Sequence, residues 1–104
     1  MQVEFTNQTT DRQFVSLQGA LNFEAMETIR QIFDVMVLDA RKEVVLDLTH
    51  VHRLDSSGVG ALVFLFKRLK AEGRKMVIHG VHGQPEAIIR LLRLEQAIDT
   101  EFLN

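Results

Sequence analysis

The sequence contains no cysteine, which excludes disulfides, thiolate zinc sites and cysteine nucleophiles together. A chain without thiols fits a reducing compartment. The N-terminus has no basic region followed by a long apolar stretch, so no signal peptide is visible. The longest mainly apolar run, Val59 to Phe66, is less than half of the roughly 20 residues that cross a membrane. We therefore expect a cytoplasmic protein without membrane insertion.

An excess of charge of one sign is also lacking, because 12 basic and 14 acidic side chains give a net charge of −2. Without a strong positive field, direct binding to nucleic acid is not expected. A hydrophobic fraction of 46% and a charged fraction of 25% are typical of a soluble globular protein. The length of 104 residues predicts one domain, residues 1–104.

Proline occurs once, at Pro85, and the glycines are scattered, so no linker, repeat or low-complexity segment is visible. Two alternating apolar patterns, residues 3–5 and 14–17, flank the polar turn Asn7–Asp11 and predict a β-hairpin. We expect Gly19 to end the second of these strands. Further short strands are predicted at residues 44–48, as a buried central strand, and at 76–78, with a last one at Phe102.

Three amphipathic helices are predicted between these strands. The first opens at Asn22, a favourable N-cap, and ends around residues 38–40; the second runs from Val59 to Gly73; the third begins near Pro85. The side chains expected on their buried stripes are Phe23, Met26, Ile29, Ile32, Phe33, Met36, Val37, Val59, Leu62, Val63, Phe66, Leu69, Ile88, Leu91, Leu92 and Leu94 or Ile98. The alternation of strands and helices predicts an α/β fold, with helices packed on a mostly parallel or mixed sheet.

The segment Leu54–Gly60, which joins the central strand to the second helix, carries the main functional signal. Ser56 and Ser57 are expected at the helix N-terminus, where free N–H groups and the helix dipole stabilise an added negative charge. A serine phosphate would bring about −1.5 to −2 charges to this place. Gly58 and Gly60 are expected to keep the adjacent surface low, so that a partner can approach closely.

Asp55 would repel such a phosphate, but its carboxylate could orient the serine hydroxyl or a kinase's metal ion. The alternative interpretation of Asp-Ser-Ser before an apolar run is an ordinary helix N-cap. The segment lacks the spacing of a phosphate-binding loop and of a nucleophile elbow. No histidine has a predictable relation to Ser56, so we do not expect an enzyme.

The remaining polar clusters suggest no cofactor and no metal site. The histidines, His50, His52, His79 and His82, lack a third ligand fixed by spacing, so exposed loop positions are expected. The basic run at residues 67–70 is typical of a solvated helix face, with steering of an acidic partner as its functional alternative. Phe64 lies off the predicted stripe and is a candidate partner contact.

Nearly the full chain resembles the STAS domain family, specifically the stand-alone bacterial anti-sigma-factor antagonists. The residues that carry the resemblance are Val44-Val45-Leu46-Asp47-Leu48 and Leu54-Asp55-Ser56-Ser57-Gly58-Val59-Gly60-Ala61-Leu62, with support from Gly19-Ala20-Leu21-Asn22 and from residues 73–78. The resemblance implies a single domain with a mixed sheet of four to five strands and helices mainly on one face.

The resemblance also implies a non-enzymatic serine phospho-switch. Ser56 matches the family's usual phosphorylation site, and Ser57 is the second candidate. The implied partners are a serine kinase that is also the anti-sigma factor, which binds only the unphosphorylated form, and a phosphatase that resets the cycle. The expected partner-binding residues are Asn22, Asp55, Ser56, Ser57, Gly58, Val59 and Gly60.

One departure from the family pattern concerns the residues before the first helix. Many phosphorylatable members read Gly-Glu-Leu-Asp there, whereas this chain reads Gly19-Ala20-Leu21-Asn22. Asn22 keeps the cap but removes one negative charge near Ser56. Related domains that lost the serine act as constitutive subunits of lipid-transporter complexes of the ABC type, and this role is the alternative function.

Overall fold

The computed structural model describes residues 1–6 and 8–103, so Asn7 of the expected turn lies outside the described residues. The elements are β1 (Gln2–Phe5), β2 (Arg12–Leu21), the 3₁₀ turn η1 (Phe23–Ala25), α1 (Met26–Leu38), β3 (Glu43–Leu54), α2 (Ser56–Ala71), β4 (Lys75–Val81), α3 (Gly83–Leu91), the 3₁₀ turn η2 (Leu94–Gln96) and β5 (Asp99–Phe102). The predicted order of strands and helices is confirmed.

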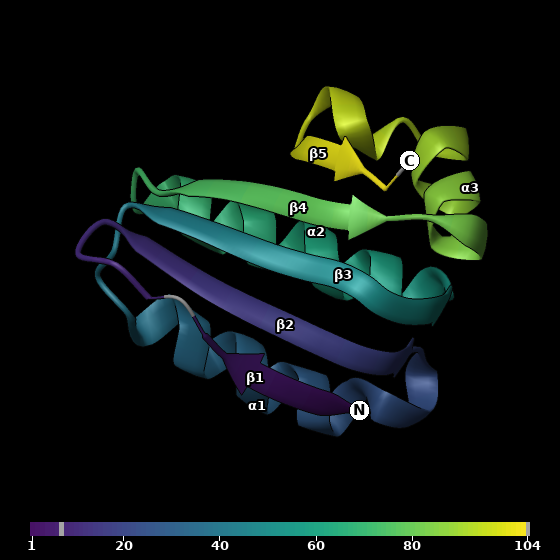
Figure 1. Ribbon diagram of the computed structural model, residues 1–104, viewed down its shortest axis with the longest axis horizontal. Helices are drawn as coiled ribbons and strands as arrows, with labels where there is room; N and C mark the ends of the chain where they lie inside the picture. The colour runs from purple at the N-terminus through teal and green to yellow at the C-terminus, as the bar shows by residue number, and fades with distance from the viewer. Residues whose placement is uncertain (7, 104) are drawn as a thin grey trace.

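The five strands form one mixed sheet in the order β1-β2-β3-β4-β5. β1 and β2 form the predicted antiparallel hairpin, and the other neighbouring strands pair in parallel. Helices α1 and α2 cover one face of the sheet, while α3 lies beyond the carboxyl ends of β3 and β4 (Figure 1). Within the part of the chain that the structure describes, the opposite face carries no helix (Figure 1).

The core lies between the sheet and the α1–α2 layer. Alternate residues of the parallel strands point into it, as the period of two in a strand requires. Its fully buried strand residues include Val15, Leu17, Leu46, Leu48 and Ile78. Facing them are Ile29 and Met36 of α1 and Leu62, Leu65 and Leu69 of α2. The two amphipathic helices thus bury their apolar stripes against one continuous apolar sheet face.

The strands are longer than the sequence pattern predicted, and β2 and β3 extend the furthest. Gly19 does not end β2, because the chain accommodates its φ of +115° at an irregularity in the β2–β3 register and continues to Leu21. β3 continues six residues beyond the expected boundary at residue 48, to Leu54. His50 and His52 therefore lie on a strand, not in a loop, although both are exposed as expected.

The expected helix stripes are only partly correct. α2 begins at Ser56 and buries Leu65, which the predicted stripe omitted. In the third helix the buried residue is Ile89, whereas Leu91 is 78% exposed, and Leu92 is also exposed. A helix turns by about 100° per residue, so Leu91 points roughly 200° away from Ile89. The stripe therefore has to be centred on Ile89.

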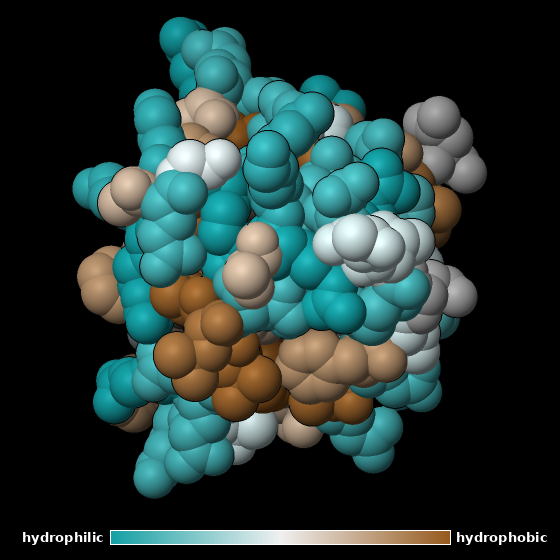
Figure 2. All heavy atoms as spheres, turned by 90° about the vertical axis from the view of Figure 1, so that its left-hand side faces the viewer, coloured by the Kyte–Doolittle hydropathy of each residue, from teal (hydrophilic) through white to brown (hydrophobic). Residues whose placement is uncertain are grey.

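Apolar side chains also gather at the end of the molecule opposite to the carboxyl ends of the parallel strands (Figure 2). Phe5, Val35 and Leu38 are exposed and line a shallow hollow between β1 and the end of α1. Among the described residues, no helix combines the length and apolar character required to span a bilayer.

The C-termini of α1 and α2 meet at Arg74. Gly73, with a φ of +72°, ends α2 as predicted, and the N–H of Arg74 returns to the carbonyl of Leu69 at 2.9 Å. The buried guanidinium of Arg74 then donates to the carbonyls of Met36 and Val37, at 3.3 and 3.1 Å. The Met36 carbonyl also accepts from the N–H of the C-cap residue Asp39 at 3.2 Å, and Arg74 adds a charged donor to this last turn of α1, where the regular helical bonds run out.

Arg74→Met is expected to lower the free energy of unfolding by about 2 kcal/mol, because carbonyls shielded from water lose a charged donor. Urea denaturation followed by circular dichroism measures the change. Arg30→Met is the matched control, since Arg30 is an exposed residue of α1. Equal midpoints for the two variants would show that Arg74 does not stabilise the end of α1.

Candidate functional site

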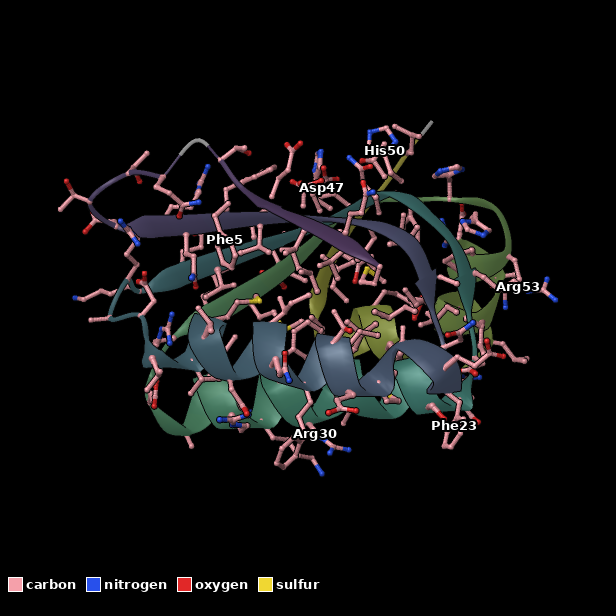
Figure 3. All side chains as sticks on the ribbon, turned by 90° about the horizontal axis from the view of Figure 1, so that it is seen from below. Phe5, Phe23, Arg30, Asp47, His50 and Arg53 are labelled. Atoms are coloured by element: carbon pink, nitrogen blue, oxygen red, sulfur yellow. The ribbon has the colours of Figure 1, made fainter. Side chains whose placement is uncertain are left out.

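The Leu54–Gly60 segment lies where β3 leaves the sheet and α2 begins. Asp55 is the N-cap residue, with extended φ and ψ of −105° and −176°, and Ser56 is the first residue of α2. The carboxyl ends of parallel strands form the edge at which α/β proteins usually place binding residues. Figure 3 shows Phe23 and Arg53 at this same end of the molecule.

Both carboxylate oxygens of Asp55 accept backbone hydrogen bonds. Oδ1 accepts from the N–H of Gly58 at 2.9 Å, and Oδ2 accepts from the N–H of Phe23 at 3.0 Å. These bonds, that from Gly58 foremost, lower the pKa of Asp55 below its ordinary value of 3.8. The helix-cap interpretation of Asp55 is therefore confirmed. The same carboxylate also ties the start of η1 to the start of α2.

Asn22 caps the neighbouring N-terminus, as predicted from its side chain. Its Oδ1 accepts from the N–H of Ala25 at 3.2 Å. The capped element is the short η1 turn, and α1 follows from Met26. Two capped N-termini, those of η1 and α2, therefore lie side by side, with Asp55 bonded to both. Their partial positive charges add at this end of the protein.

The two candidate serines differ in exposure. Ser56 is exposed, whereas Ser57 and Val59 are partly buried. The Asp55 carboxylate was expected to orient a serine hydroxyl. In the structure both of its oxygens instead accept hydrogen bonds from backbone N–H groups. Of the two hydroxyl groups, that of Ser56 is the more accessible to a modifying enzyme.

Gly58 and Gly60 have different roles. A Cβ on Gly58 would lie 2.1 Å from the carbonyl oxygen of Leu21 and 2.6 Å from Cδ1 of Leu54. The expectation that Gly58 keeps the surface low is therefore wrong, because Gly58 is buried and lets α2 approach the end of β2. A Cβ on Gly60 would meet nothing within 4 Å, and Gly60 is exposed, as expected of a surface position.

Gln84 is a residue of the site that sequence reasoning missed. Its Oε1 accepts from the N–H of Leu54, and its Nε2 donates to the carbonyl of Leu54, both at 2.8 Å. β4 pairs with β3 only as far as residue 47, so the Gln84 amide replaces a strand partner directly before Asp55. No local sequence pattern predicts that a glutamine in the first turn of a helix will bind the backbone of a distant strand.

Phe23 was also assigned wrongly by its helical spacing. It was expected on the buried stripe of the first helix, but it lies in η1 and is 73% exposed. The 3₁₀ turn precedes α1, so Phe23 does not share the angular position of Ile29 and Met36. An exposed aromatic ring beside Asp55 is a typical contact residue in protein interfaces.

The histidines do not converge on this end. Nδ1 of His79 lies 2.7 Å from Oε1 of Glu101, and Nε2 of His82 lies 2.8 Å from the carbonyl of Thr49. Across residues 1–6 and 8–103, no three histidine, aspartate or glutamate side chains gather as metal ligands would.

Comparison with known proteins agrees with this architecture. The model of the STAS domain family matches residues 2–103. The chain belongs to the STAS domain family. The solved structures that it resembles include anti-sigma factor antagonists, and at identities below 20% this similarity shows a shared fold.

Three solved structures illustrate the similarity. An anti-sigma factor antagonist from Mycobacterium paratuberculosis has a TM-score of 0.83 at 19% identity, with 96% of this chain and 86% of that chain covered. The Bacillus cell fate determinant SpoIIAA, in its phosphorylated form, has a TM-score of 0.71 at 18% identity over 95% and 90% of the two chains. A sulfate transporter family protein from Wolinella succinogenes has a TM-score of 0.77 at 16% identity over 93% and 80%.

The hydrogen bonds of Asp55 predict a pH-dependent contribution to stability. Because its folded pKa lies below its ordinary value of 3.8, the contribution is complete above that value and is lost as the pH falls through the folded pKa. Asp55→Ala is thus expected to be less stable than wild type at pH 7, with a difference that shrinks in acid. Urea denaturation of both proteins from pH 7 to pH 2 tests this, and a pH-independent difference would contradict it.

The two glycines provide a matched pair of substitutions. Gly58→Ala is expected to lower the thermal midpoint strongly, because the new Cβ overlaps the Leu21 carbonyl. Gly60→Ala is expected to leave the midpoint unchanged or raise it, since alanine favours a helix over glycine by up to about 1 kcal/mol. Calorimetry measures both, and similar midpoints for the two variants would disprove the distinction.

Proposed function

We propose that this STAS protein is an anti-sigma-factor antagonist regulated by phosphorylation of Ser56. The observation that carries the proposal is an exposed serine at the first position of α2, directly after a carboxylate whose oxygens are both occupied. The similarity in fold to anti-sigma factor antagonists, among them phosphorylated SpoIIAA, supports it. The protein acts by binding, without catalysis of its own.

The docking surface comprises the residues around the two capped N-termini: Asn22, Asp55, Ser56, Ser57, Val59 and Gly60, with Phe23 as an added aromatic contact. Its partner is a serine kinase that is also an anti-sigma factor, and a phosphatase restores the unmodified form. Gly58 is buried beneath this surface and contributes to it indirectly, because its close packing against Leu21 sets the position of α2.

The switch works through local electrostatics. A phosphate on Ser56 adds about −1.5 to −2 charges at a helix N-terminus, which tolerates negative charge, so α2 remains folded. The added charge and bulk stand directly on the docking surface, beside the ionised Asp55, and repel a partner that fits the bare serine. Asn22 carries no charge, and the acidic groups at these two N-termini include Asp55, the N-cap of α2, and Glu24, in the first turn of η1.

A constitutive role in a membrane transport complex is the second candidate. The similarity in fold to the sulfate transporter family protein, together with an asparagine at position 22, favours it. In that role the same surface binds its partner regardless of Ser56, which then serves only to start α2.

Affinity capture with wild-type, Ser56→Ala and Ser56→Asp baits distinguishes the two roles. The switch predicts that the wild-type and Ser56→Ala baits both recover an anti-sigma kinase. This kinase, once purified and supplied with ATP, is expected to phosphorylate wild type but not Ser56→Ala. Ser56→Asp is expected to bind the purified kinase at least about tenfold more weakly. Ser57→Asp is the matched control for the second serine.

Recovery of transporter components by all three baits would favour the constitutive role. Phosphorylation at Ser57 with Ser56 unmodified would move the switch by one residue. Equal affinity of the three baits for the purified kinase would disprove regulation at Ser56.

A further inference from the structure

Phe23 is the most exposed aromatic residue in the part of the chain that the structure describes. It is 73% exposed, compared with 63% for Phe64 and 44% for Phe5. Ala25 and Met26 pack against the hydrophobic core, but Phe23 is not among the residues that do. Figure 3 shows Phe23 on the side of the helical layer that faces away from the sheet. Burial within the monomer therefore does not explain this ring, and aromatic residues are enriched at protein interfaces.

The backbone of Phe23 is held by the second oxygen of Asp55. The N–H of Phe23 opens η1, and the first N–H groups of a helical turn have no partner inside that turn. Here the partner is Oδ2 of Asp55, at 3.0 Å and 32 residues later in the chain. Asn22 holds the other end of the turn, because its Oδ1 accepts from the N–H of Ala25 at 3.2 Å. The turn that carries the exposed ring is thus fixed at both ends before any partner binds.

Capping of α2 alone does not require an aspartate at position 55. The cap uses one acceptor, since Oδ1 accepts from the N–H of Gly58 at 2.9 Å. An asparagine caps a helix about as well as an aspartate, but its side chain has only one oxygen. With that oxygen on Gly58, the amide nitrogen would face the N–H of Phe23 and could not accept from it. The second oxygen of Asp55 therefore serves the turn that carries Phe23, not α2.

We propose that Phe23 is the anchor residue of the docking surface, which enters an apolar pocket on the partner, and that Asp55 is the residue that positions it. This inference rests on the proposed docking function and adds which side chain contributes most to affinity. A turn that is fixed before binding loses little conformational freedom when its ring is buried, so prior ordering favours a tighter complex.

Isothermal titration against the purified anti-sigma kinase tests the anchor. Phe23→Ala is expected to weaken binding at least about 30-fold, as for a central interface residue. Phe23→Leu is expected to recover part of the affinity, because its side chain remains apolar. Leu38→Ala is the matched control, since Leu38 is 85% exposed and lies at the far end of α1, and it is expected to bind like wild type. If the wild-type bait recovers transporter components instead, the same variants are titrated against that purified component.

Asp55→Asn tests the positioning role, because it keeps the cap of α2 and removes the acceptor for Phe23. The order parameter of the Phe23 amide, from ¹⁵N relaxation, is expected to fall from about 0.85 to about 0.6. Affinity is expected to fall about three- to tenfold through the lost prior ordering. In a Phe23→Ala background, Asp55→Asn is expected to cause no further loss, since the two residues act as one unit. Glu24→Gln removes a charge from the same turn and is expected to leave the order parameter unchanged.

The outcomes separate the anchor from the phospho-switch. Wild-type affinity of Phe23→Ala, or an equal loss in Leu38→Ala, would overturn the anchor whatever Ser56→Asp does. Independent, additive losses for Asp55→Asn and Phe23→Ala, or an unchanged order parameter, would overturn the positioning role. A partner that tolerates Ser56→Asp but no longer binds Phe23→Ala would support the anchor and disprove only the switch.

Discussion

The site depends on one carboxylate that serves two helix ends. Asp55 accepts from Gly58 within its own helix and from Phe23, which is 32 residues earlier in the chain. One side chain thereby fixes the first turn of α2 and the entry to α1 relative to each other. Ser56 follows directly, so its position is defined by a local cap and by a distant segment at the same time. A residue at a helix N-terminus with such support can change its charge without unfolding the helix.

Two further contacts hold this end of the protein from either side. Gly58 allows α2 to approach the Leu21 carbonyl at the end of β2, with no room for a side chain. Gln84 binds both backbone groups of Leu54, where β4 no longer pairs with β3. The segment before Ser56 is therefore fixed by β2 on one side and by α3 on the other. Such support suits a surface that a partner must recognise in one conformation.

The placement of helices on one face of the sheet determines where partners can meet the protein. α2 carries the proposed switch at its first turn, and over the following turns Gly60 and Phe64 line the groove that it forms with α1. Its buried stripe, with Leu62, Leu65 and Leu69, holds it against the sheet. One helix thus presents two surfaces that overlap at Gly60.

The sequence by itself determined the features that depend on neighbouring residues: the hairpin, the cap at Asn22, the cap at Asp55 before Ser56, and the end of α2 at Gly73. Caps and turns form between backbone groups a few residues apart, so local chemistry specifies them. The tertiary structure alone decided that Phe23 is exposed, that Gly58 is buried and that Gln84 binds Leu54. These outcomes depend on which distant segment packs beside each residue. The spacing of apolar residues along one helix does not specify that neighbour.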